Sequence, residues 1–317
     1  MNTSGVLEMS RLQEACVKAA LAGMQVLRPY QTGAAVLGSP VLKQDSSLLT
    51  VADGDSEEAI LGVLTQLEPG IPVLAEESGL VGIDTSLADY TGDLVFLVDP
   101  ADGTFPLALG GSTTTVAVSV YSRFKQEVVA AAIGCPATGR LYFSNEGKTF
   151  VRRYDTADWE LKTQQLCRTW QGEPSSRMGI WLDVSHSFTR QDYLTGKQRP
   201  VLDEAQVGRL MEGLRRHGRM QMYGSNADHQ RLVASGAEYA GACITTAVGG
   251  PWDLPGILLA VNAGGAAAGF RLETDHEGHQ RLTKVDFLDA LRCDLVVTAH
   301  SSKTVVLLAD VLRGCIG

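Results

Sequence analysis

Residues 94–104 read LVFLVDPADGT, and this stretch decides how the rest of the chain is interpreted. Its first five residues are apolar and of strand length, which predicts a buried β-strand. A tight turn follows, because Pro100 fixes its own φ angle and Gly103 tolerates the backbone conformations that sharp turns require. Asp99 and Asp102 lie in this turn three residues apart, so both carboxylates can converge on one point at the end of the strand.

Two carboxylates this close need a positive partner. At a separation of about 4 Å they repel by roughly 4 kcal/mol at an effective dielectric constant near 20, so such a pair usually holds a cation or a shared proton. Oxygen ligands favour Mg²⁺, Mn²⁺ or Ca²⁺ over zinc. A plain surface turn is the alternative. Haloacid-dehalogenase-type phosphatases also have Asp and Gly-Thr after an apolar strand, but their two aspartates lie two residues apart, which disfavours covalent aspartyl-phosphate chemistry here.

Three further segments place acidic residues next to apolar runs: LLTVAD at 48–53, VLAEESG at 73–79 and GGPWDLPG at 249–256. Each has an alternative explanation, because Asp53 and Asp253 could be helix N-caps and Glu76 and Glu77 could simply be solvated. Taken together with the turn at 99–104, the set instead predicts an acidic site assembled from distant parts of the chain.

These motifs resemble those of the inositol monophosphatase superfamily of Mg²⁺-dependent, lithium-sensitive phosphatases. Its members carry a Gly-Glu-Glu-Ser-like segment, an Asp-Pro-x-Asp-Gly-Thr turn and a Trp-Asp pair before a C-terminal helix. Here these are AEES at 75–78, DPADGT at 99–104 and Trp252-Asp253. The resemblance implies an α/β fold, the layered αβαβα sandwich, and a phosphomonoesterase that uses metal-activated water. It also implies two to three Mg²⁺ ions, with Mn²⁺ as a possible substitute.

The resemblance also implies the metal ligands. Glu76 and Asp99, with the main-chain carbonyl of Ala101, correspond to the ligands of a first ion. Asp99, Asp102 and Asp253 correspond to those of a second, so that Asp99 bridges the two. A third, weaker ion is expected near Glu76.

Other positions correspond to the family's catalytic and phosphate-binding groups. Thr104, with its hydroxyl oriented by Asp53, matches the pair that activates the attacking water, and Glu76 acts with them. The N–H groups of Gly103 and Thr104 are expected to hold the phosphate at the start of a helical turn. The segment that lines the substrate pocket corresponds to Gly224, Ser225 and Asn226.

One departure from the family pattern concerns the substrate. Inositol monophosphatases carry a glutamate seven residues before the Trp-Asp aspartate, whereas this chain has Thr246 there. The missing charge-assisted hydrogen bond is worth roughly 1.5 to 3 kcal/mol, which disfavours free inositol phosphate. A 3'(2'),5'-bisphosphate nucleotidase or a sugar (bis)phosphatase is the alternative, as is a histidinol phosphatase. A non-catalytic relative that binds metal or a phosphorylated ligand is the alternative from a different class, but it would not need the Asp53–Thr104 pair.

The remaining cysteine and histidine residues indicate no competing chemistry. The six cysteines form no close pair, and Cys135 and Cys243 lie in apolar settings typical of buried structural thiols. His276 and His279 fit the tip of a hydrophilic hairpin. His229 could face either the pocket or the core.

Length and composition fit a globular enzyme. At 317 residues the chain can form an N-terminal α+β part, 1–165, with an antiparallel sheet and most metal ligands, and a C-terminal α/β part, 166–317, that adds Asp253. A net charge of −9 disfavours a nucleic-acid polymer or an anionic membrane as partner. Unpaired cysteines and a polar start after Met1 favour the cytoplasm. A homodimer is expected because family members commonly form one.

Hydrophobic periodicity predicts the elements. The N-terminal part is expected to contain helices over 8–28 and from Asp53 or Asp55 to Leu67, then strands over 94–98, 113–121, 127–134, 140–144 and 148–153. A polar connector is expected near 154–176, and a polar loop over 185–200 could cover the site or serve an interface. The C-terminal part is expected to contain strand 178–183, helices 203–217 and 226–235, strand 240–245, helix 253–264, strand 294–298 and helix 302–313.

Overall fold

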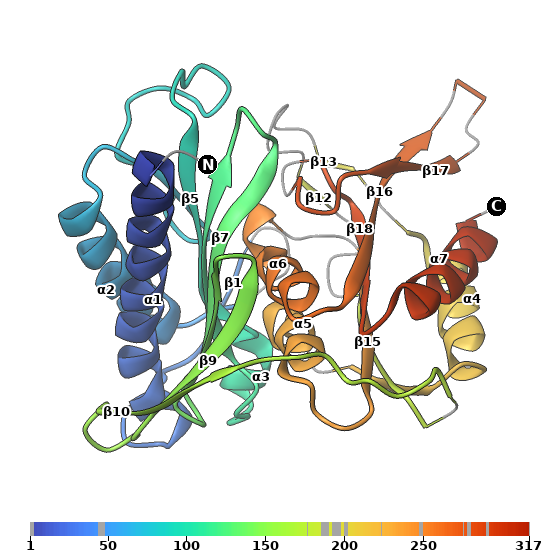
Figure 1. Ribbon diagram of the computed structural model, residues 1–317, viewed down its shortest axis with the longest axis horizontal. Coiled ribbons are helices and arrows are strands. Elements are labelled where there is room, and N and C mark those ends of the chain that lie inside the picture. The colour runs from blue at the N-terminus through green and yellow to red at the C-terminus, as the bar shows by residue number, and fades with distance from the viewer. Residues whose placement is uncertain are drawn as a thin grey trace.

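The computed structural model describes residues 3–43, 48–175, 177–184, 190–191, 198–199, 202–222, 224–246, 250–274, 276–277, 280–289 and 292–316. Two large β-sheets and three layers of helices alternate across the molecule (Figure 1). This confirms the expected αβαβα sandwich.

The first helical layer consists of α1 (Thr3–Gln31) and α2 (Val51–Leu67). It covers the outer face of the larger sheet (Figure 1). The face of α1 that the sequence predicts as apolar is buried throughout: Leu12, Ala15, Cys16, Ala19, Ala20, Met24 and Leu27.

The larger sheet has eight strands in the order β10-β9-β8-β7-β6-β5-β3-β4. Their bounds are Val73–Ala75 (β3), Gly79–Val81 (β4), Leu94–Asp102 (β5), Thr115–Ser122 (β6), Glu127–Cys135 (β7), Arg140–Asn145 (β8), Lys148–Tyr154 (β9) and Leu161–Leu166 (β10). The sheet is antiparallel as expected, except that β3 and β5 pair in parallel. Because both β3 and β5 point the same way, their carboxyl ends reach the same edge of the sheet.

The middle layer, α5 (Asn226–Ser235) and α6 (Pro255–Asn262), lies between the two sheets (Figure 1). The second sheet has the strand order β14-β11-β15-β18-β16-β17. Its strands are Gly179–Asp183 (β11), Arg219–Gln221 (β14), Ala240–Thr246 (β15), Ala266–Thr274 (β16), Gln280–Val285 (β17) and Leu295–Ala299 (β18). Helices α4 (Glu204–Arg215) and α7 (Ser302–Ile316) cover its outer face.

Short elements complete the fold: β1 (Val41–Leu42), β2 (Leu48–Leu49), α3 (Thr104–Ala108), β12 (Arg190–Gln191), β13 (Gln198–Arg199) and the 3₁₀ turn η1 (Pro251–Asp253). Apart from β12 and β13, the predicted 185–200 loop lies outside the described residues. The last strand of the larger sheet along the chain, β10, ends at Leu166, and the first strand of the second sheet, β11, begins at Gly179. The division into two parts, 1–165 and 166–317, stays a prediction.

Strand β5 shows why the apolar run at 94–98 indicated a buried strand. Val95 and Leu97 pack in the core formed with α5 and α6, whereas Phe96 and Val98 pack in the core beneath α1 and α2. Helices cover both faces of the sheet, so both sets of alternating side chains must be apolar.

Several element predictions were wrong in detail. The connector near 154–176 contains β10, an edge strand whose six residues are all exposed and therefore show no apolar alternation. Helix α2 begins at Val51, two residues before Asp53, because Thr50 takes the N-cap position. Strands β16 and β17 were not predicted, although the turn that contains His276 and Glu277 connects them as a hairpin tip.

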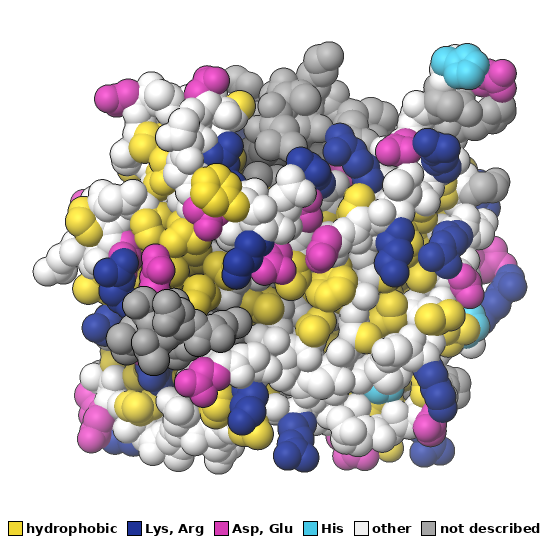
Figure 2. Space-filling view, turned by 45° about the horizontal axis from the view of Figure 1, so that its top comes forward, with side chains coloured by type: hydrophobic (Ala, Val, Ile, Leu, Met, Phe, Trp, Pro, Cys, Tyr) yellow, Lys and Arg dark blue, Asp and Glu magenta, His cyan; other side chains and the backbone are white. Residues whose placement is uncertain are grey.

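The surface that Figure 2 shows has interspersed acidic and basic side chains. Among the residues described, no helix combines the length and the apolar character that crossing a membrane requires.

Candidate metal and phosphate site

Three buried aspartates lie together where β5 ends. Asp99, Asp102 and Asp253 are 3%, 7% and 5% exposed, and each offers a carboxylate oxygen within 4.8 Å of the others. Asp99 and Asp102 come from β5, and Asp253 comes from the 3₁₀ turn η1, which begins 149 residues after β5 ends. The sequence-based expectation that these acids converge is therefore met in the geometry.

A β-bulge brings Asp99 and Asp102 to the same side. Asp99 continues the face of β5 that looks towards α5 and α6, and regular alternation would turn Asp102 to the opposite face. The pairing of β5 with β6 shifts register between Asp99 and Asp102, and Ala101 packs in the core beneath α1 and α2. The extra residue of the bulge thus aims Asp102 back towards α5.

The first turn of α5 holds the Asp102 carboxylate. The Ser225 hydroxyl donates to Asp102 Oδ2 over 2.7 Å, and the Ala227 N–H donates to the same oxygen over 2.6 Å. The Asn226 N–H donates to Asp102 Oδ1 over 3.2 Å. Ser225 is also the N-cap of α5, since its oxygen accepts from the Asp228 N–H. The Ser225 hydroxyl is thus bonded to a candidate metal ligand. The predicted contact of Gly224, Ser225 and Asn226 with a leaving group stays a prediction.

Gly103 is required at the junction between β5 and α3. Its φ is +96°, in the left-handed region, and a Cβ there would lie 3.1 Å from Ser225 Cβ and 3.4 Å from the Gly224 carbonyl oxygen. Glycine therefore allows the turn and the 224–226 segment to pack closely. Thr104 begins α3, as the expected helical turn requires.

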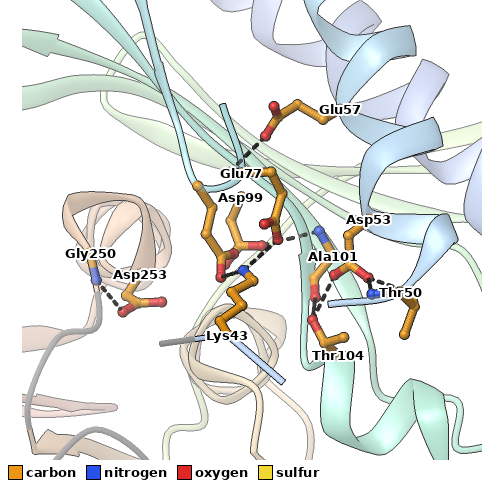
Figure 3. A network of polar contacts seen from close by, with 11 residues as sticks. Lys43, Thr50, Asp53, Glu57, Glu77, Asp99, Ala101, Thr104, Gly250 and Asp253 are labelled. Atoms are coloured by element: carbon orange, nitrogen blue, oxygen red, sulfur yellow. Dashed lines mark hydrogen bonds and ion pairs between the residues drawn. The ribbon is translucent and has the colours of Figure 1, made fainter. Parts of the chain in front are cut away.

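Asp253 is oriented by its own turn. The Gly250 N–H donates to Asp253 Oδ2 over 2.9 Å, and the side-chain amide of Gln230 donates to the Asp253 carbonyl over 2.8 Å. Pro251 occupies the first position of η1, and Pro255 begins α6 directly afterwards. The predicted helix over 253–264 therefore starts after Asp253, and the carboxylate points into the site instead of capping α6 (Figure 3).

Asp53 and Thr104 form the expected pair. The Thr104 hydroxyl lies 2.7 Å from Asp53 Oδ1 and donates to it, with the Ala101 carbonyl oxygen 3.3 Å away. Asp53 Oδ2 accepts from the Thr50 N–H over 2.8 Å and from the Thr50 hydroxyl over 2.5 Å. Asp53 is thus the third residue of α2, and its carboxylate is held by three donors while it orients Thr104 (Figure 3).

Glu76 lies beside a lysine to which the sequence had given no role. Lys43 Nζ is 3.0 Å from Glu76 Oε1. It is 2.6 Å from Glu77 Oε1 (Figure 3). Glu77 is itself anchored, because its N–H donates to Glu57 Oε2 over 3.0 Å. Burial lowers the pKa of Lys43, but the attraction of Glu76 and Glu77 outweighs burial and raises that pKa above its ordinary value. In the sequence, Lys43 is the single lysine among residues 41–49, and nothing near it indicates that it contacts Glu76 or Glu77.

The carboxyl groups of the site resist ionisation when no cation is present. Burial raises the pKa of Asp99 well above its ordinary value, and repulsion from Glu76, Asp102 and Asp253 adds to the effect. Burial, with repulsion from Asp253, raises the pKa of Asp102 to about 8. Burial and repulsion from Glu76 raise the pKa of Glu77 to about 7. These shifts are those expected where several acidic groups are buried close together.

The donor set fits a hard divalent cation. It consists of carboxylate and carbonyl oxygens, which suit Mg²⁺ and Mn²⁺, and the described part of the cluster includes neither cysteine nor histidine. The oxygens of Asp99, Asp102 and Asp253 already converge, so a cation would relieve their repulsion. The Ala101 carbonyl oxygen lies 3.3 Å from the Thr104 hydroxyl, and its role as a metal ligand stays a prediction.

The cysteines, His229 and Thr246 were also considered in the sequence, and the structure locates each of them. All six cysteines are buried thiols outside any disulfide, and burial raises the pKa of Cys135 to about 11 and that of Cys243 to about 12. His229 is 1% exposed and sits one turn into α5. Thr246 ends β15, and its side chain lies outside the described residues.

Comparison with known proteins agrees with this geometry. The sequence profile described as "Inositol monophosphatase family" matches residues 8–278. A crystal structure of the extragenic suppressor protein SuhB from Bartonella henselae superposes with a TM-score of 0.67 and 20% identity, covering 97% of this chain and 98% of that one. An inositol monophosphatase structure from Thermotoga maritima gives a TM-score of 0.62 at 14% identity, with 99% and 100% covered. At these identities the likeness shows the fold.

Curated relatives match over a shorter stretch. An inositol-1-monophosphatase from Mycobacterium bovis is 32% identical over 99 residues, which is 31% of this chain and 33% of that protein. A glucose-1-phosphate thymidylyltransferase from Streptomyces griseus is 36% identical over 97 residues, or 29% and 35%. The chain thus matches about a third of the length of these relatives. The family profile, by contrast, covers most of the chain and all the acidic residues of the site, so the chain belongs to the inositol monophosphatase family.

Proposed function

We propose that this protein is a Mg²⁺-dependent phosphomonoesterase that hydrolyses a small phosphorylated metabolite. The observation that supports this most strongly is the convergence of Asp99, Asp102 and Asp253 beside the Asp53–Thr104 hydrogen bond. A binding protein would need the acids alone. A hydrolase also needs a group that orients water, and Thr104 lies at the start of α3 directly after the bulge.

The proposed metal ligands are those that the resemblance to the family implies. Asp99 would bridge two ions, with Glu76 and the Ala101 carbonyl on one side and Asp102 and Asp253 on the other. When bound, Mg²⁺ lowers the pKa of a water molecule and stabilises the negative charge of the leaving oxygen. The Gly103 and Thr104 N–H groups, at the start of α3, are the proposed contacts to the phosphate.

The hydroxyl of Thr104 has a defined direction. Its proton is donated to Asp53 Oδ1, so a lone pair of Oγ1 remains to accept a hydrogen bond from the attacking water and orient it. Thr50 holds Asp53 through both of its donors, which prevents the carboxylate from turning away. We therefore assign Thr104 as a catalytic residue and Asp53 as the residue that positions it.

Thr104→Val should remove this function while preserving shape. We expect kcat to fall about a hundredfold or more, the size typical of a lost proton-transfer group. The affinity for Mg²⁺ should not change, because Thr104 is not a proposed ligand. Thr104→Ser keeps the hydroxyl and should retain activity within about tenfold of the native value. If Thr104→Val and Thr104→Ser were equally active, Thr104 would not orient the water.

The residue at position 246 bears on the choice of substrate. Thr246 stands where inositol-binding relatives have glutamate, so we propose a phosphate ester other than free inositol phosphate, with a bisphosphate nucleoside or a sugar (bis)phosphate as the leading alternatives. Membership of the family further supports a cytoplasmic, lithium-sensitive homodimer as proposals. The thymidylyltransferase name of one relative is not transferred, because its match covers 29% of this chain.

Phosphate release tests the proposal. Chelator-treated protein should be assayed with and without Mg²⁺ against inositol monophosphates, 3'-phosphoadenosine 5'-phosphate, fructose 1,6-bisphosphate and histidinol phosphate. We expect Mg²⁺-dependent turnover of at least one compound, with inositol monophosphates not the best. A folded protein that binds Mg²⁺ but releases phosphate from none of them would favour the non-catalytic alternative.

A further inference from the structure

Lys43 supplies a positive charge inside the acidic site. Its ammonium contacts two neighbouring carboxylates, Glu76 at 3.0 Å and Glu77 at 2.6 Å. The side chains of all three are largely shielded from water, with exposures of 19%, 23% and 12%. Within the described ranges, Lys43 is the only lysine or arginine in an ion pair with either glutamate. The contact is therefore part of the site's charge balance and is better shielded than an exposed surface pair.

The two partners of Lys43 differ in what else they can do. Glu76 is a proposed metal ligand and interacts electrostatically with Asp99, the proposed bridging ligand. Glu77 is not a proposed ligand, and its backbone is tied to α2 through Glu57. One contact of the ammonium thus lies on a proposed metal ligand, and the other lies on a neighbouring carboxylate that is not one.

A divalent ion and this ammonium would be close like charges. An ion bound by Glu76 and Asp99 would share the Glu76 carboxylate with Lys43, and its charge repels the ammonium twice as strongly as a monovalent ion would. A lysine ammonium is a compact charge on a flexible stem, so it can move between nearby acceptors without rearranging the fold. Glu77 offers such an acceptor.

We propose that Lys43 is the counter-cation of the metal-free site, which Mg²⁺ displaces from Glu76 while Glu77 retains the ammonium. The inference rests on the metal site of the proposed function and deepens it by naming the residue that regulates metal affinity. Lys43 holds the acids together when no metal is bound and competes with the metal when it arrives. It acts through Glu76 and is therefore a positioning residue.

The test measures Mg²⁺ binding by isothermal titration calorimetry on the full chain. We expect Lys43→Met to bind Mg²⁺ about tenfold more tightly than the native protein, a difference of about 1.4 kcal/mol. The same variant without metal should unfold at a lower temperature, because Glu76 and Glu77 lose their cation. Lys43→Arg keeps the charge and should bind Mg²⁺ with nearly native affinity.

Lys125→Met is the matched control. Lys125 is 60% exposed and lies at the turn between β6 and β7, at the end of the sheet opposite Asp102, so this variant changes the net charge equally without touching the site. It should bind Mg²⁺ as the native protein does. Lys43→Gln repeats the measurement should Lys43→Met fail to fold.

Two outcomes would overturn the inference in different ways. Unchanged or weaker Mg²⁺ binding by Lys43→Met and Lys43→Gln would show that Lys43 does not compete with the metal, while the metal site itself stands. Absence of Mg²⁺ binding by the native protein and every variant would refute the metal site of the proposed function, and the role of Lys43 with it.

Discussion

Asp99→Asn should lower Mg²⁺-dependent phosphate release by about a thousandfold or more, equivalent to about 4 kcal/mol of transition-state stabilisation. At pH 8, the metal-free variant should nevertheless be at least as stable as the native protein. The loss of activity and the retained or increased stability have the same cause. Asp99 is the proposed bridging ligand, and in the absence of metal it is a buried acid repelled by Glu76, Asp102 and Asp253.

An asparagine at this position keeps the shape and removes the charge. Asp99 Oδ1 accepts a hydrogen bond from the Ala101 N–H over 3.1 Å, and an amide oxygen can accept the same bond. The bulge that aims Asp102 is therefore retained. The substitution removes a negatively charged ligand between two proposed cations, so it lowers activity only through metal binding.

The control is a buried aspartate outside the site. Asp289 is 5% exposed and accepts from the Tyr121 hydroxyl over 2.7 Å. Asp289→Asn should keep phosphate release within about twofold of native, since it leaves every proposed ligand in place. Thermal unfolding of both variants separates lost chemistry from lost folding. Asp99→Asn with nearly native turnover would show that Asp99 is not a ligand of a catalytic metal.

The second large effect is a dependence of protein stability on pH that disappears when Mg²⁺ binds. Metal-free Asp102 has a pKa of about 8, whereas an aspartate in the unfolded chain titrates near 3.9. Between these values the folded protein holds a proton that the unfolded chain has lost. The free energy of unfolding of the metal-free protein should therefore fall as pH rises from about 4 to 8, by about 1.4 kcal/mol per pH unit for each such group.

Mg²⁺ should remove this dependence. A bound cation stabilises the ionised carboxylate, so the folded and unfolded states then hold the same number of protons at this position. Thermal unfolding at pH 6, 7 and 8, in chelator and in saturating Mg²⁺, should show a gain in Tm from Mg²⁺ that grows with pH. Asp102→Asn should flatten the curve measured in chelator. Metal-free stability that stayed constant or rose over this range would mean that the acids are already compensated by other charges.

The sequence predicted that acidic side chains converge at the end of β5, because short segments place these acids. The apolar run before Asp99, the Pro-Ala-Asp-Gly turn and the paired glutamates each lie within a few residues, and local spacing records how they fold. The bulge at Ala101, which makes Asp99 and Asp102 point together, was implied only by their spacing of three residues.

Contacts between distant segments could not be predicted in the same way. The Ser225 hydroxyl donates to Asp102, which is 123 residues away in the chain, and the sequence did not predict this contact. Lys43 reaches Glu76 and Glu77 from another loop, 33 and 34 residues away. Neither contact can be recognised from nearby sequence, because each depends on how α5 and the segment after β1 pack against the larger sheet.

Elements without amphipathic patterns were missed for a similar reason. Every residue of β10 is exposed, so only its backbone pairing with β9 makes it a strand. Strand β16 begins with three alanines, which favour no strand by propensity, and its pairing with β18 and β17 decides its conformation. Tertiary pairing outweighs local preference in both cases.

A crystal structure of the protein soaked in Mn²⁺, with anomalous scattering recorded, tests the central claim most directly. We expect an anomalous peak about 2 Å from carboxylate oxygens of Asp99, Asp102 and Asp253, and a second between Asp99, Glu76 and the Ala101 carbonyl. Lys43 should then contact Glu77 and no longer Glu76. A well-ordered structure without manganese between these aspartates, at concentrations that support turnover, would contradict a metal-dependent phosphatase site here.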